Sequence, residues 1–281
     1  MITVGPVHIS SNLDAAKIIL YLSTVKIDLK ANNSPGGYKM RITAFNGSPR
    51  GKGSNTGIMV SEFLEGAASE GSQAEQIFLS EKKIGHCMGC FKCWTATPGK
   101  CVINDDMKDL LEKVMKSDLI ILATPLYVDD VTGIMKDFMD RLIPLMDPHF
   151  ESDSSGEWRH VKRLGSYPYI AVISNCGMPG RQHFQVLKLH FRRMARNFHS
   201  MVTAEIYLDC GELLKNQVLI LKPVIARYRK FLRKAGEEVA KDGIISAKTA
   251  VKLEKPLISA AMYIKEANKF WDKQLGSGTK S

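Results

Sequence analysis

The 281-residue chain lacks several features that would assign it to a particular class of protein. Six cysteines are too few for a disulfide scaffold in a chain of this length. The first residues lack the basic start, apolar middle and small-residue cleavage site of a secretory signal, and no apolar run is long enough to span a bilayer. We therefore expect a cytoplasmic protein without membrane contact. Four of the cysteines lie between residues 87 and 101, which predicts metal or redox chemistry.

The charge balance is basic, with a formal net charge of +10. Much of the excess lies in the later half of the chain, in segments with a helical pattern. No nucleic-acid-binding motif accompanies these charges, so we expect solvated helix faces and attraction of an anionic cofactor or partner, and no nucleic-acid partner.

Strand-like segments alternate with helical patterns through the middle of the chain. The strand candidates are residues 41–47, 72–80, 118–125, 166–175 and 201–209. This alternation predicts an α/β fold with a doubly wound, five-stranded parallel sheet.

The flanking segments differ from this central domain, which we place at residues 40–216. Residues 1–39 end in the turn-rich NNSPGG and are predicted to form an N-terminal extension. Residues 217–281 have a helical pattern, interrupted at Asp242-Gly243 and at Pro256, which predicts a C-terminal helical appendage.

A glycine-rich polar loop, residues 46–56, follows the first strand candidate and precedes a helix. In parallel α/β sheets such a loop lies at the carboxyl edge, where a helix N-terminus offers unpaired N–H groups to a phosphate. The side chains suited to this ligand are Ser48, Arg50, Lys52, Ser54, Asn55 and Thr56.

Other interpretations of this loop remain open. Asn55 or Thr56 could simply cap the helix while the glycines form a turn. The Walker A pattern fails, since the loop is one residue short and has glycine after the lysine. A Rossmann dinucleotide fingerprint is imperfect, because the spacing is G-x-G-x3-G.

The clustered cysteines have the spacing C-x2-C-x2-C-x7-C, and three glycines lie among and beside them. Four thiolates suit one [4Fe–4S] cluster, with Cys87, Cys90, Cys93 and Cys101 as ligands. A structural zinc site, or cysteines without a metal, are the alternatives. Because this loop follows the second strand candidate, we expect it at the same carboxyl edge as the glycine-rich loop. Asp105 and Asp106 are predicted to cap the next helix. Lys136, Asp140 and Arg141 are predicted to serve the scaffold or an oligomer contact.

The segment GSPRGKGSNT, residues 47–56, resembles the phosphate loop of the NADPH-dependent FMN reductase and iron–sulfur flavoprotein families, which share the flavodoxin-like fold. ATPLYVDDVTGIMKDFMDR, residues 123–141, is similar to their second flavin loop and the helix after it. SNCGMPGR, residues 174–181, resembles their third flavin loop. The resemblance covers about residues 40–211.

The resemblance implies an FMN site and assigns residues to it. The FMN phosphate is expected at Ser48, Arg50, Ser54, Asn55 and Thr56. The isoalloxazine ring is expected at the second and third loops, namely Pro125, Leu126, Tyr127, Asn175, Cys176 and Gly177. NAD(P)H is the implied co-substrate, homodimers or homotetramers are the implied assemblies, and no catalytic side chain is required.

Three functions follow from these features. The first is an electron-transfer flavoprotein with FMN and a [4Fe–4S] cluster, taking electrons from NAD(P)H or a ferredoxin-like donor. The second is a cluster-free NAD(P)H-dependent oxidoreductase that reduces FMN or quinones. The third is a zinc-stapled binding module with a basic tail.

Overall fold

The computed structural model describes residues 39–276, so the predicted N-terminal extension lies outside the described residues except for its last position. The central sheet consists of five parallel strands in the order β2-β1-β3-β6-β7. Their bounds are β1 Arg41–Asn46, β2 Gln73–Phe78, β3 Leu119–Pro125, β6 Tyr169–Asn175 and β7 Val202–Leu208. The predicted doubly wound parallel sheet is confirmed, and its strand order is that of flavodoxin-like folds.

Helices cover both faces of the sheet. Their bounds are α2 Asn55–Ser69, α3 Met107–Lys116, α4 Gly133–Asp140, α5 Gln185–Asn197, α6 Lys222–Asp242, α7 Ala247–Leu253 and α8 Ala260–Gln274. One apolar core lies between the sheet and helices α2 and α6, and a second lies between the sheet and helices α3, α4 and α5. The central strand β3 is buried on both sides, which explains its continuous apolar sequence.

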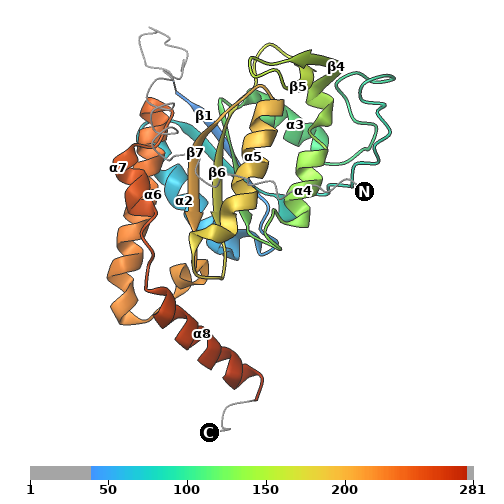
Figure 1. Cartoon of the computed structure of the whole chain (residues 1–281). Helices are drawn as coiled ribbons and strands as arrows, with labels where there is room; N and C mark the ends of the chain where they lie inside the picture. The colour runs from blue at the N-terminus through green and yellow to red at the C-terminus, as the bar shows by residue number, and fades with distance from the viewer. Residues whose placement is uncertain (1–38, 277–281) are drawn as a thin grey trace, which may run out of the picture.

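Helix α6 packs closely on α2 and so is part of the helical layer that covers one face of the sheet. A Cβ atom added at Gly66 would lie 1.9 Å from the carbonyl oxygen of Arg233, and one added at Gly236 would lie 1.9 Å from that of Phe63. Only glycine permits these backbones to approach so closely. The predicted break is present, because α6 ends at Asp242 and Gly243 adopts a left-handed φ of 75°. Helix α8 extends away from the sandwich (Figure 1).

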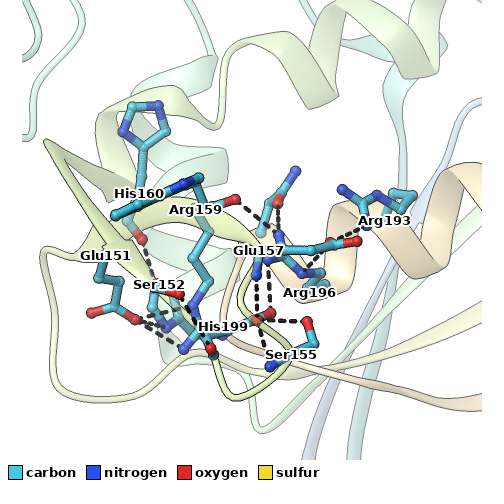
Figure 2. A network of polar contacts seen from close by, with 12 residues as sticks. Glu151, Ser152, Ser155, Glu157, Arg159, His160, Arg193, Arg196 and His199 are labelled. Carbon is cyan, nitrogen blue, oxygen red and sulfur yellow. Dashed lines mark hydrogen bonds and ion pairs between the residues drawn. The ribbon is translucent and has the colours of Figure 1, made fainter.

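A two-stranded hairpin that we did not predict follows α4. It consists of β4 (Met146–Ser152) and β5 (Trp158–Lys162). Charged side chains join it to the last turn of α5, as Figure 2 shows. Arg196 forms ion pairs with Asp153 at 2.7 Å and Glu157 at 3.0 Å, and Arg193 pairs with Glu157 as well. Because α5 ends beside the amino end of β7, the hairpin lies toward the amino edge of the sheet.

Short 3-10 turns complete the described chain. They are η1 Gly51–Gly53, η2 Leu79–Glu81, η3 Ile143–Leu145, η4 Arg181–Phe184, η5 Gly211–Lys215 and η6 Leu219–Leu221. Between residues 39 and 276, no helix has the length and apolar character needed to cross a membrane.

Candidate functional site

The loops after β1, β3 and β6 meet at the carboxyl edge of the sheet. Strands β1 and β3 are neighbours, and the strand order reverses between them. In open α/β sheets a ligand binds at this switch point, because the chain leaves the two strands toward opposite faces and opens a crevice.

The glycine-rich loop is held by its own hydrogen bonds. The Gly47 N–H donates to the Ala123 carbonyl at 2.8 Å, and the Ser48 N–H donates to Asn46 Oδ1 at 2.9 Å. Ser54 caps α2, since its Oγ accepts from the Gly57 N–H at 2.8 Å and donates to the Gly51 carbonyl at 2.7 Å. The backbone N–H groups of Asn55 and Thr56 have no intrahelical acceptor, as at any helix start, so the loop presents an anion nest.

Thr56 and Asn175, like Ser54, were predicted to bind the ligand but contact protein atoms. Thr56 Oγ1 accepts a hydrogen bond from Asn175 Nδ2 at 2.8 Å, which joins the first loop to the third. A Cβ atom on Gly211 would lie 2.7 Å from Asn175 Oδ1, so this amide is tightly enclosed. The Nδ2 atom of Asn46, by contrast, is buried without a partner in the described structure. A buried donor of this kind at the base of the loop fits a phosphate oxygen.

Charges surround the loop unevenly. Arg50 and Lys52 are exposed on it, and the Lys215 ammonium, which we did not predict, donates to the Gly53 carbonyl. Glu212 lies in η5 near Gly177. Burial raises the pKa of its carboxyl, although its own backbone and the nearby Arg50 act in the opposite direction.

The second loop turns sharply after Pro125. The Leu126 N–H donates to the Asn175 carbonyl at 2.8 Å, and Tyr127 is bridged to Asp130 by backbone hydrogen bonds of 2.9 and 3.1 Å. Val128 adopts a φ of 50°, which is strained for a β-branched residue. The turn leaves the Tyr127 side chain 46% exposed, where it could lie against a planar ring.

The third loop, residues 175–180, is anchored to the end of β7. The Cys176 N–H donates to the Leu208 carbonyl at 3.0 Å, and the Gly180 N–H donates to Asp209 Oδ2 at 2.8 Å. Burial raises the pKa of the Cys176 thiol to about 11, so this thiol stays protonated near neutral pH. Gly177 is exposed and presents backbone groups at the edge of the crevice.

Helix α4 begins against the glycine-rich loop. Thr132 is buried, and its Oγ1 donates to the Gly47 carbonyl at 2.6 Å while accepting from the Met135 N–H at 3.3 Å. A Cβ atom at Gly47 would lie 2.7 Å from that of Met135. Glycine at position 47 and a hydroxyl at position 132 therefore fix α4 to the loop.

The other end of α4 carries a buried clamp, which we define as Arg141, Asp105 and Gly85. Arg141 is 1% exposed, and its two terminal nitrogens donate to Asp105 at 2.7 and 2.9 Å. One of them also donates to the Gly85 carbonyl at 2.7 Å. Asp105 in turn accepts from the Gly85 N–H at 2.9 Å and from the Met107 N–H at 3.1 Å. The clamp joins the two ends of the cysteine loop.

The cysteine loop leaves the sheet at the carboxyl edge beside the glycine-rich loop, as predicted: Glu81, at the end of η2, pairs with Lys52 at 4.0 Å. From there it runs toward the hairpin. Trp94 Nε1 donates to the Ile143 carbonyl at 3.2 Å, and the Trp94 ring lies 4.9 Å from that of His160 on β5. The physical reason is the clamp: it holds the base of the loop at the C-terminal end of α4, beside the hairpin.

The four predicted ligand thiols are close but not assembled. Cys87 and Cys90 are exposed, Cys101 is half-buried and Cys93 is buried. Burial raises the pKa of the Cys93 thiol, and the neighbouring thiols raise it further. Within residues 39–276, no three Cys, His, Asp or Glu side chains are grouped so that they could hold a metal ion.

Comparison with known proteins identifies relatives of the central domain. The model of a family described as NADPH-dependent FMN reductase matches residues 40–208. An iron–sulfur flavoprotein of Methanocaldococcus jannaschii is 41% identical over 106 residues, which are 38% of this chain and 53% of that protein. An iron–sulfur flavoprotein of Archaeoglobus fulgidus is 40% identical over 105 residues, 37% of this chain and 46% of that protein. The match thus spans about half the length of these curated relatives.

A solved structure supports the fold. An FMN-dependent NADH-azoreductase from Bacillus anthracis, in complex with FMN, superposes with a TM-score of 0.54 at 16% identity. The superposition covers 72% of this chain and all of that one.

The clamp predicts an acid-sensitive contribution to stability. Burial alone would raise the pKa of Asp105, but the hydrogen bonds from Arg141, Gly85 and Met107 lower it overall. Its stabilisation is therefore complete above the ordinary Asp pKa of about 3.9 and is lost as the pH falls through the lowered folded-state value. Asp105→Asn should reduce the free energy of unfolding by about 3 kcal/mol at pH 7, because it leaves a buried arginine unpaired.

Urea unfolding of both proteins between pH 3 and pH 7 tests this expectation. The difference between wild type and Asp105→Asn should shrink below pH ~4. Asp109→Asn, at an exposed position on α3, is the matched control and should leave stability unchanged. A difference of the same size at pH 3 and pH 7 would contradict the assignment.

Proposed function

Because the chain belongs to the NADPH-dependent FMN reductase family, whose model matches residues 40–208, we propose that it is an FMN-binding oxidoreductase. In this proposal it takes electrons from NAD(P)H or a ferredoxin-like donor and passes them to an acceptor. The observation that carries the proposal is the anion nest at the β1/β3 switch point, with the start of α2 open above it.

The first loop would hold the FMN phosphate. The free N–H groups at the start of α2 and the buried Asn46 Nδ2 supply neutral donors. Arg50 supplies a charge, and Ser48 lies buried at the floor of the loop. Ser54, Thr56 and Asn175 would act by holding the loops in place, since their side chains are bound to protein atoms.

The second and third loops would hold the ring. Pro125 and Leu126 would lie along the ring, Tyr127 offers its exposed side chain, and Cys176 and Gly177 follow the neighbouring strand, whose Asn175 carbonyl accepts from the Leu126 N–H. FMN, when bound, supplies the chemistry by accepting a hydride and passing its electrons on. The protein needs no acid or base for this step, in keeping with a Cys176 thiol that stays protonated.

We also propose a [4Fe–4S] cluster at Cys87, Cys90, Cys93 and Cys101. Four thiols at this spacing fit the cluster chemically, and the name iron–sulfur flavoprotein belongs to relatives that match this chain. The described arrangement is open, however, so the exposed Cys87 and Cys90 would have to move toward Cys93 on binding. The cluster-free NAD(P)H-dependent FMN or quinone oxidoreductase is the second candidate, because the description of the matching family names FMN and no cluster.

A homodimer or homotetramer is the proposed assembly. Helix α8 carries exposed apolar side chains along its length, namely Met262, Ile264, Phe270, Trp271 and Leu275. An apolar surface of this kind on a helix that extends from the body is typical of an oligomer contact.

Arg50→Ala tests the phosphate site. Removal of a charge-assisted hydrogen bond should weaken FMN binding about five- to tenfold in a fluorescence titration. Riboflavin, which has no phosphate, should bind both proteins equally. Arg227→Ala removes an exposed arginine of α6 and should leave both affinities unchanged. Equal FMN affinity for wild type and Arg50→Ala would remove Arg50 from the site.

Cys90→Ala tests the cluster. Protein purified without oxygen should contain about four iron and four sulfide per chain, and Cys90→Ala should lose both while retaining FMN. Cys210→Ala alters a buried cysteine outside the loop and should keep the cluster. FMN without iron in the wild type would establish the cluster-free oxidoreductase, and zinc without FMN would contradict the whole proposal.

A further inference from the structure

The C-terminal helices contact the third loop from beyond the residues that match the family model. Tyr263 of α8 is 8% exposed, and its hydroxyl donates a hydrogen bond to the Gly177 carbonyl. Glu254, next to the end of α7, pairs with Arg181 at 3.1 Å. Both contacts come from residues C-terminal to position 208, where the family match ends.

We propose that Tyr263 is a positioning residue for the flavin ring. This inference rests on the proposed function, because it assumes that the third loop contacts FMN. By holding the Gly177 carbonyl, Tyr263 fixes the orientation of the peptide between Gly177 and Met178.

The geometry of a trans peptide gives this contact a consequence. The carbonyl and the following N–H of a planar trans peptide point in opposite directions. With its carbonyl turned toward α8, the peptide directs the Met178 N–H away from α8. That N–H has no acceptor within the described residues, so it is free to donate to the edge of a ring.

The contact matters because the middle of the loop is otherwise exposed. Hydrogen bonds to β7 and its end fix Cys176 and Gly180, and the Met178 carbonyl accepts from the Cys210 N–H at 3.3 Å and from the Cys176 thiol at 3.2 Å. Within the described residues the Gly177 carbonyl accepts a hydrogen bond from Tyr263 alone. Tyr263, in contrast, is packed in the core between the sheet and α6. Tyr263 therefore supplies the hydrogen bond that fixes the peptide between Gly177 and Met178.

Tyr263→Phe removes the hydroxyl and keeps the ring. We expect the dissociation constants of FMN and of riboflavin to rise by the same factor, about three- to tenfold, because the phosphate loop is untouched. The midpoint potential of the bound flavin should shift as well, since a hydrogen bond to the ring is weakened. Tyr169→Phe is the matched control, because no hydrogen bond of the Tyr169 hydroxyl is found in the described structure.

The outcomes separate this inference from the proposed function. Wild-type protein that binds neither flavin contradicts the proposed function. If the wild-type protein binds both flavins, two results for Tyr263→Phe overturn the positioning role: unchanged affinity for both flavins, or weaker affinity for FMN alone. If Tyr263→Phe does not fold, a crystal structure of the wild-type protein with FMN decides: a Met178 N–H directed at the ring supports the role, and one directed elsewhere overturns it.

Discussion

The buried ion pair between Arg141 and Asp105 determines where the cysteine loop can lie. Taking these charges out of water is costly, and the pair persists because each group is also hydrogen-bonded, to Gly85 and to Met107. A pair of this kind contributes geometry more than net stability. At the other end of the same helix, Thr132 holds the Gly47 carbonyl. Helix α4 therefore sets the distance between the glycine-rich loop and the base of the cysteine loop, about 14 Å along its axis.

This arrangement separates two kinds of chemistry within one chain. The anion nest, Tyr127 and the third loop face the crevice at the carboxyl edge of the sheet. The cysteine loop is held at its base by the other end of α4, and its Trp94 contacts the β4–β5 hairpin, which α5 holds by ion pairs (Figure 2). The C-terminal helices add a third element, because they support the loop at Gly177 from outside the matched domain.

The sequence predicted the sheet well because its central strands are apolar throughout, as in β3. It predicted the first loop because glycines there precede a residue that caps a helix. It could not predict the hairpin, whose sequence is polar, contains a proline, and is held by arginines of the distant helix α5. The end of β2 correctly predicted the edge at which the cysteine loop emerges. It could not predict the course of the loop toward the hairpin, because the clamp that fixes its base joins residues 36 positions apart. We did not predict the role of Thr132, although a threonine just before a helix commonly caps it. The contacts of Lys215 and Tyr263 could not be predicted, because each joins residues far apart in the sequence.

A crystal structure of the protein with FMN tests the central claim most directly. We expect the phosphate within hydrogen-bond distance of the backbone N–H groups that begin α2, and the ring between Tyr127 and the third loop. The Gly177 carbonyl should still accept from Tyr263, with the Met178 N–H turned to the ring. A flavin bound elsewhere on the protein, with the glycine-rich loop free of phosphate, would contradict the account.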